Sequence, residues 1–276
     1  MSRRQLITSD VSAFDVHDHV AWCGDGLPAL HEVAGAAFAS ALARNERLLF
    51  VCDEPDFEGL AKLGGLDDLD DLIANRVLLT STVDETYQHF PDARAQQVEF
   101  ESVLGHALRD GYTGICVVAD NSRQVGSTDE EFARWLRWEA TADRLQAARP
   151  VTGICYFDRA RVPTDRLADL AAMHPVLSTG LREPNFRLFH DIDTVRLTGE
   201  VDILLVEQLR RLLGSLPSPA EDVFDLSDLE FVDHRGLRAL SELARQGNPV
   251  RVRNARPIVR RVWDVIDAGS AGLEFC

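Results

Sequence analysis

The first imidazole and thiol groups of the chain are those of His17, His19 and Cys23. Imidazole nitrogen and thiolate sulfur at close spacing can share a zinc ion. The pattern H-x-H-x-x-x-C has no recognised paired spacing, however, and a fourth ligand would have to come from elsewhere in the chain. We therefore expect no metal here, and the preferred interpretation is a structural role or an apolar ligand pocket.

A second group of polar residues stands where strand-like runs end. Its members are Cys23, Asp53, Glu54, Asp120, Asn121 and Asp158. In a parallel sheet such positions meet at one edge, which is where ligands bind. The preferred interpretation is that the acids cap the helices that follow them. The alternative is a pocket that a few of them line.

Nucleotide hydrolysis is one chemistry that acids such as Asp53, Glu54 and Asp120 could support, beside a phosphate and Mg²⁺. It needs a phosphate loop of the form G-x-x-x-x-G-K-[ST]. The single lysine of the chain is Lys62, outside any such loop, and the turn Gly24-Asp25-Gly26 carries an acid that repels phosphate. This excludes ATP hydrolysis by P-loop chemistry. An enzyme that uses these acids otherwise stays as an alternative, although the sequence places no complete set of nucleophile, base and orienting group.

Strand-like and helical segments alternate as far as about residue 180. Strands are predicted at residues 47–52, 76–80, 112–119 and 151–157, after a shorter one within residues 17–26. Helices are predicted at residues 30–42, 58–74, 95–109 and 129–148. This alternation predicts an α/β fold with a largely parallel sheet covered on both faces. The stripe Phe132, Trp135 and Trp138 has helical spacing and indicates core packing, which leaves the neighbouring Glu139 without an assigned role.

The composition limits the class of protein. The chain has 276 residues, of which 45% are hydrophobic and 27% charged, enough for one large or two small globular domains. The net charge of -16 argues against nucleic-acid and anionic-membrane partners. No apolar run follows the first arginines, as it would in a secretory signal, and none is long enough to span a bilayer. Five scattered cysteines predict reduced thiols in a cytoplasmic protein.

Several short motifs stand out in the first part of the chain: His19-Val20-Ala21-Trp22, the stretch LARNERLLFVCDEP, Trp138-Glu139, Ile154-Cys155-Tyr156-Phe157-Asp158 and His174-Pro175. Together they resemble the MEDS domain, a sensory domain of methanogen and methylotroph regulators, over residues 14–178. The resemblance implies a degenerate RecA-like or KaiC-like fold that lacks the P-loop and senses small organic, hydrocarbon-derived molecules. Many relatives carry a cysteine two residues after the histidine, whereas this chain has Ala21, with the cysteine displaced to Cys23.

Candidate ligand-binding residues of the sensory domain come from these motifs and from the strand ends. They are His19, Trp22, Cys23, Asp53, Glu54, Trp138 and Glu139.

A linker is predicted at residues 179–185, which are polar and interrupted by Gly and Pro. It follows a leader at residues 1–13 and the sensory domain at 14–178, and it precedes a small α/β domain at 186–276. In that domain we expect a hairpin at 186–189 and 194–197, a helix opened by Gly199-Glu200-Val201-Asp202 that ends near Gly214, strands at 223–226 and 250–252, and a last helix at 257–266.

Residues 225–240 are predicted to run from a buried strand through the turn Asp233-His234-Arg235-Gly236 into a helix. Such a junction offers unpaired backbone N–H groups and the positive end of the helix dipole. Both favour a phosphate or an anionic partner.

Three motifs of the second domain occur in a characteristic order: Leu197-Thr198-Gly199-Glu200-Val201-Asp202, then Asp225-Leu226-Ser227, then Phe231-Val232-Asp233 with Gly236-Leu237. They resemble the STAS domain of anti-sigma factor antagonists, over residues 186–276. In that family a cognate anti-sigma kinase phosphorylates the serine that follows the turn aspartate. Here His234 takes its place, so the usual switch cannot operate at this residue, and Ser227 is a second candidate.

The resemblance also implies a partner-binding surface, made of Asp202, Asp233, His234, Arg235 and Gly236. We expect a non-enzymatic signalling regulator without a cofactor, in which the first domain senses a small organic molecule. The second domain then binds an anti-sigma factor, a serine-kinase-like protein or another STAS-binding regulator, and the chain can form a homo-oligomer. The alternatives are an enzyme or nucleotide-binding protein that uses the strand-end acids, and an oligomerising scaffold.

Overall fold

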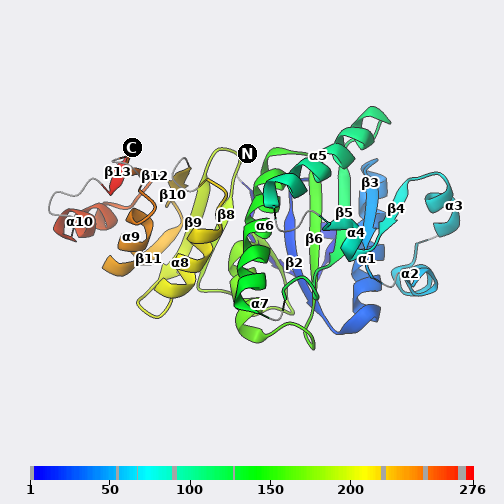
Figure 1. The fold of residues 1–276 in the computed structure, drawn as a ribbon, viewed down its shortest axis with the longest axis horizontal. Coiled ribbons are helices and arrows are strands. Elements are labelled where there is room, and N and C mark those ends of the chain that lie inside the picture. Colours follow the sequence, from blue (N-terminus) through cyan, green and yellow to red (C-terminus); the bar gives the residue numbers. More distant parts are fainter. Residues whose placement is uncertain are drawn as a thin grey trace.

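Two β-sheets, one after the other along the chain, organise the computed structural model (Figure 1). The structure describes residues 3–53, 56–66, 68–88, 92–126, 128–218, 222–244, 248–266 and 272–276. Glu54, a candidate ligand-binding residue, lies outside the described residues.

The first sheet has seven parallel strands in the order β1-β7-β2-β6-β5-β3-β4. Its strands are β1 Leu6–Thr8, β2 His19–Gly24, β3 Arg47–Val51, β4 Leu78–Ser81, β5 Ile115–Asp120, β6 Val151–Asp158 and β7 Val176–Ser178. The central strands are buried along nearly their whole length because helices cover both faces. The predicted α/β fold with a parallel sheet is therefore confirmed.

The two faces of this sheet carry different helices. The helices are α1 Gly26–Ala43, α2 Phe57–Gly64, α3 Leu69–Ala74, α4 Val83–Thr86, α5 Ala93–Arg109, α6 Asp129–Ala148 and α7 Thr164–Met173, with the 3-10 helix η1 at Val11–Ala13. Because side chains alternate along a strand, Val20 and Ile154 pack in one apolar cluster with α1, while Ala21 and Cys155 pack in another with α5, α6 and α7.

Two sequence predictions need correction in this first part, and one strand was missed. The single helix predicted at residues 58–74 is two helices, because Gly65 ends α2 in the left-handed region with φ 63°. Residues 1–13, predicted as a leader, contribute β1 and η1 to the fold. The short strand β7, which lies between β1 and β2, was not predicted, because three residues are too few to show a strand pattern.

The second sheet has six strands. They are β8 Phe186–His190, β9 Val195–Val201, β10 Val223–Asp225, β11 Leu229–Val232, β12 Val250–Arg253 and β13 Leu273–Phe275, with helices α8 Val206–Ser215, α9 His234–Ser241 and α10 Pro257–Ile266. β8 is antiparallel to β9, and the other pairs are parallel.

Two predictions for the second sheet are wrong in detail. Gly199-Glu200-Val201-Asp202 does not open a helix, since β9 runs through Val201 and α8 begins at Val206. The stretch 225–240 contains the end of β10 and then a further strand, β11, which pairs with β9 beyond the point where β10 leaves it. The turn into α9 lies where it was predicted.

An apolar contact joins the two sheets. α6 and α7 of the first part pack against α8 and β8 of the second, and buried residues from both parts belong to one apolar cluster. Figure 1 shows β8 and α8 beside α6 and α7, with the N-terminal end of the chain between the two sheets. The connecting segment is packed as well, since Leu181 is 8% exposed and the Thr179 N–H donates to the Thr8 carbonyl.

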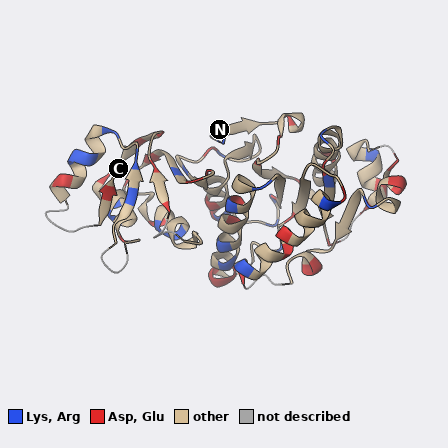
Figure 2. Cartoon of the chain, turned by 90° about the horizontal axis from the view of Figure 1, so that it is seen from above, with Lys and Arg blue, Asp and Glu red and all other residues tan. Residues whose placement is uncertain are grey.

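Charged residues of both signs occur on both parts of the molecule (Figure 2). Among the described helices, none is long and apolar enough to cross a membrane.

The contact between α1 and α2 depends on a glycine. A Cβ atom at Gly35 would lie 2.0 Å from the Gly64 carbonyl oxygen, and backbone cannot move aside as a side chain can. We expect Gly35→Ala to lower the free energy of unfolding by about 1–3 kcal/mol, as overpacking does. Urea unfolding followed by circular dichroism measures this.

Gly105→Ala in α5 is the matched control. Its nearest neighbour there would be the end of the Arg109 side chain at 3.4 Å, so the helix preference for alanine should raise stability by about 0.5–1 kcal/mol. Equal effects of the two substitutions would contradict close packing of α1 on α2.

Candidate functional site

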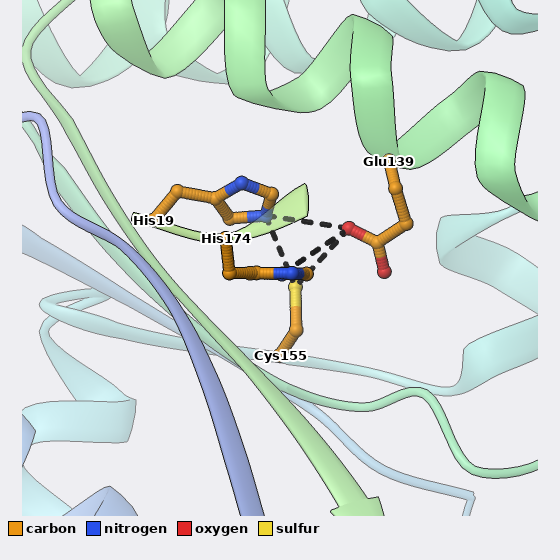
Figure 3. Close-up of side chains that lie close together, drawn as sticks. All are labelled: His19, Glu139, Cys155 and His174. Atoms are coloured by element: carbon orange, nitrogen blue, oxygen red, sulfur yellow. Dashed lines mark hydrogen bonds and ion pairs between the residues drawn. The ribbon is translucent and has the colours of Figure 1, made fainter. Parts of the chain in front are cut away.

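Four side chains that can bind metals or protons meet between the first sheet and α6 (Figure 3). His19 opens β2, and Cys155 lies in the adjacent strand β6, whose register pairs it with Ala21. His19 and Cys155 therefore face the same side of the sheet, toward α6. Glu139 extends from α6, and His174 follows the last residue of α7.

The polar ends of these side chains converge within 4.8 Å of one another. Glu139 Oε2 lies 3.3 Å from His19 Nε2 and 3.6 Å from His174 Nε2. Cys155 Sγ lies 3.5 Å from His19 Nε2 and 3.7 Å from Glu139 Oε2. Both imidazoles are fully buried and the Glu139 side chain is 1% exposed, so bulk water does not solvate this cluster.

The Nδ1 atom of each histidine, which points away from the cluster, makes a hydrogen bond. His19 Nδ1 lies 3.1 Å from Asp143 Oδ1, and His174 Nδ1 lies 2.8 Å from the Leu170 carbonyl oxygen. A carboxylate and a carbonyl only accept hydrogen bonds, so both Nδ1 atoms carry the proton and donate. In each neutral ring the Nε2 lone pair then points into the cluster.

The two imidazoles have opposite tendencies to hold a proton. Burial lowers the pKa of His19, but its hydrogen bonds to Asp143 and Glu139 outweigh that effect and leave the pKa raised. Burial and the neighbouring His19 charge lower the pKa of His174 to about 4. Burial, with the charge of Glu139, raises the pKa of the Cys155 thiol well above its usual range. The cluster therefore accommodates positive charge at His19 and a neutral ring at His174.

Asp143 connects this cluster to the second sheet. It lies four residues after Glu139 on α6 and so occupies the same face of the helix. Its Oδ1 accepts a hydrogen bond of 2.6 Å from Arg3 Nη1, and its Oδ2 accepts one of 2.5 Å from the backbone N–H of His190, in β8. Burial opposes the charge of Asp143, yet the Arg3 guanidinium and the bonds from His19 and His190 hold its pKa well below the usual value.

A small apolar cavity of about 30 Å³ lies beside Cys155. Tyr87, Phe100 and Trp138 line it, and Trp138 packs with its ring centroid 5.3 Å from that of Phe100. This volume accommodates a water molecule or an organic group of similar size.

The structure brings only some of the predicted site residues together. His19 and Glu139 belong to the cluster, and Trp138 lies next to it. Trp22 points to the opposite face of the sheet, where it packs against Phe14, since successive residues of β2 alternate. Cys23 shares the face of His19 but lies at the far end of the strand, outside the cluster.

The strand-end acids lie apart from the cluster and accept hydrogen bonds from backbone N–H groups, two of them within their own turns and one, at Asp53, from the start of α4. Asp120 accepts from the Ser122 N–H at 3.0 Å, and Asp158 from the Ala160 N–H at 2.9 Å. Asp53 accepts from the Val83 N–H at 3.3 Å and pairs with Arg123.

Sequence reasoning did not find Cys155, His174, Asp143 or Arg3 as site residues. Cys155 and His174 belong to motifs of the MEDS resemblance, which is the one signal that could have pointed to them. Asp143 has the spacing from Glu139 of a residue on the same helix face, but nothing in the sequence marks that face as buried and polar.

The partner-binding residues predicted for the second domain lie around the start of α9. Asp233 Oδ1 accepts from the N–H groups of Arg235 and Gly236, at 2.8 and 2.9 Å, so these donors are already bonded. His234 and Arg235 are exposed. Asp202 lies just after β9, which is joined to this turn by the bond from the Asp233 N–H to the Val201 carbonyl.

Two family models match the chain. Residues 18–175 match the model described as MEDS: MEthanogen/methylotroph, DcmR Sensory domain, and residues 189–273 match the one described as Mlab, STAS domain. A comparison with curated proteins returns no match. All four cluster residues lie in the first match and His190 in the second, so Asp143 joins the two matched regions.

Loss of the Asp143 charge should destabilise the fold. Asp143→Asn leaves the Arg3 guanidinium, whose side chain is 6% exposed, without its anion, and breaking one partner of a buried pair costs about 3–5 kcal/mol. Denaturant unfolding checks this value. The control is Asp110→Asn, whose pair with Arg47 is exposed on the aspartate side and should contribute no more than about 1 kcal/mol. A similar small loss for both variants would show that the Arg3–Asp143 pair is not essential.

Proposed function

The chain belongs to the family of the MEDS sensory domain and carries a STAS domain behind it, and we propose that it is a non-enzymatic signalling regulator. In this proposal the buried cluster of His19, Glu139, Cys155 and His174 is the sensory site. Its state controls how the STAS domain presents its surface to a regulatory partner.

The observation that carries this proposal is the position of Asp143. Through Oδ1 this carboxylate binds His19 of the cluster, and through Oδ2 it accepts a hydrogen bond from the backbone N–H of His190, in β8 of the STAS domain. Arg3 Nη1 bridges the same carboxylate and the His190 carbonyl oxygen, at 2.7 Å. A ligand or proton that moves His19 therefore changes the hydrogen bonding of β8.

Such a contact can transmit a signal because buried hydrogen bonds to a carboxylate are strong and depend on the positions of both partners. A ligand shifts an equilibrium between two domain arrangements only by its difference in affinity for them. A buried carboxylate with three donors loses several kcal/mol when one of them moves away. The shared apolar core of α6, α7, α8 and β8 gives the two parts a common surface on which to shift.

The output surface in this proposal is the end of the second sheet around the start of α9. Exposed apolar side chains lie near Asp202, His234 and Arg235: Leu204 is 84% exposed and Phe231 50%. Apolar groups flanked by charges are typical of protein-binding surfaces. We propose an anti-sigma factor, a serine-kinase-like protein or another STAS-binding regulator as the partner.

Two observations favour this function over catalysis by the strand-end acids. Asp53 is paired with Arg123, and Asp120 and Asp158 accept hydrogen bonds from their own turns. None of the three belongs to the buried His19 cluster.

Coupling between the domains can be measured by hydrogen–deuterium exchange. We expect His19→Gln to speed amide exchange in β8 and α8, because the substitution removes the imidazole that donates to Asp143, whose carboxylate also binds the β8 backbone. His31→Gln is the control, since His31 is also buried but packs on the opposite face of the sheet, near Phe50. Unchanged exchange in the second domain of the His19 variant would remove the basis of the proposal.

Regulation without phosphorylation at the α9 turn has its own test. The native chain, incubated with an anti-sigma-type serine kinase, should take up no phosphate on residues 233–236, because His234 lacks the hydroxyl. His234→Ser in a Ser227→Ala background should become labelled, since the exposed turn then offers a serine. Label on native Ser227, detected by mass spectrometry, would instead move the regulatory site to that residue.

A further inference from the structure

We propose that His19, Glu139, Cys155 and His174 form a binding site for one divalent transition-metal ion of the zinc class. The four residues come from β2, α6, β6 and the end of α7, and they meet only in the folded domain.

Four of the six distances between the polar atoms match those around a tetrahedral ion, and the other two are no longer than 4.8 Å. Zinc bonds of about 2.0–2.1 Å to nitrogen or oxygen and about 2.3 Å to sulfur place tetrahedral ligand atoms about 3.4 Å apart, or about 3.6 Å apart when one is sulfur. The observed separations between Glu139 Oε2 and the two imidazole Nε2 atoms are 3.3 and 3.6 Å. Those from Cys155 Sγ are 3.5 Å to His19 Nε2 and 3.7 Å to Glu139 Oε2.

The two histidines are oriented as metal ligands are. Each donates its Nδ1 proton outward, His19 to Asp143 and His174 to the Leu170 carbonyl, which leaves the Nε2 lone pair for an ion. A carboxylate behind a histidine fixes the tautomer and increases the basicity of the ligating nitrogen. Asp143 has this place behind His19.

Hydrogen bonding among protein groups leaves part of the cluster unsatisfied. His174 Nε2 and Glu139 Oε1 are buried and have no hydrogen-bond partner among the described residues. The converging atoms are nearly all lone-pair carriers, and the Cys155 thiol can donate to only one of them. A cation at their centre would be bound by all four groups at once.

The ligand set selects the class of ion. Two imidazoles, one carboxylate and one thiolate suit Zn²⁺ and the neighbouring divalent ions Co²⁺, Ni²⁺ and Fe²⁺, whereas Ca²⁺ and Mg²⁺ require mainly oxygen ligands. As the metal–sulfur bond forms, the Cys155 S–H bond breaks and its proton is released to the solvent. The carboxylate of Glu139 and the resulting Cys155 thiolate together balance the two positive charges of the ion. The loaded site has no net charge, which is the state that burial favours.

Ala21 is the register neighbour of Cys155 on the adjacent strand, so the side chains of these two residues point to the same side of the sheet. In this chain β6 provides the sulfur.

The test uses the full chain, stripped of metal with a chelator and titrated with Co²⁺ and then Zn²⁺. We expect one Co²⁺ per chain, with the intense visible bands of tetrahedral cobalt and a thiolate-to-cobalt charge-transfer band in the near ultraviolet. Zn²⁺ should displace it. Cys155→Ser should abolish the charge-transfer band, and Asp143→Asn, which acts behind His19, should weaken binding about 10- to 100-fold.

Two control variants each remove a thiol or an imidazole that lies outside the cluster. Cys23→Ser and His31→Gln remove a buried cysteine and a buried histidine of the same domain and should leave the cobalt spectrum and the stoichiometry unchanged. The cobalt spectrum of the native chain tests the site even if a variant fails to fold. Absence of tetrahedral cobalt in the native chain, or a charge-transfer band that survives Cys155→Ser, would overturn the assignment.

Metal binding and signalling can fail separately. The metal site rests on geometry alone, and its role as the sensory ligand rests on the proposed function. Zinc that binds without changing amide exchange in β8 supports the metal site and contradicts its role as the sensory ligand. A His19→Gln effect on β8 in a chain that binds neither Co²⁺ nor Zn²⁺ supports the coupling and contradicts the metal site.

Discussion

The buried carboxylate of Asp143 is the constraint on which the arrangement of this molecule depends. Burying a carboxylate costs several kcal/mol of free energy unless positive charge and hydrogen-bond donors replace the solvent. Arg3, His19 and the His190 N–H supply them, and they come from the N-terminal segment, the first sheet and the second sheet. Three parts of the chain that are distant in sequence are therefore held together, because each donates a hydrogen bond to the same buried carboxylate.

Helix α6 lets that carboxylate reach both domains. Its buried face presents Trp135 and Trp138 to the apolar core and Glu139 and Asp143 to the polar cluster, within two turns of the same helix. The same helix packs against β8 and α8 of the second part. A polar pathway and an apolar contact therefore run side by side between the domains, and a displacement of α6 affects both.

The sequence supports the fold more strongly than the site. Alternation of apolar strands and amphipathic helices predicts the parallel sheet, and the motifs around His19 and Asp233 indicate the two families. The helix that was wrongly predicted to start at Gly199 shows the limit of local signals. In the sequence this glycine indicates the end of a strand. In the structure it has φ 79°, yet its pairing with β8 and β11 continues strand β9 through it. The cluster lay beyond such reasoning, because strand order decides that Cys155 stands beside Ala21. Arg3 in a polar leader likewise gives no sign that it will be buried.

The bond between Arg3 and the His190 carbonyl also bears on how the chain folds. These residues are 187 positions apart, and β1 completes the edge of the first sheet directly after Arg3. A ribosome makes Arg3 early, but its partner in β8 appears only after the whole first domain has been synthesised. Contacts of such long sequence separation close slowly, since loop closure costs entropy before the contact contributes. The N-terminal segment can therefore make this bond only after β8 has been synthesised, when the rest of the first domain is already complete.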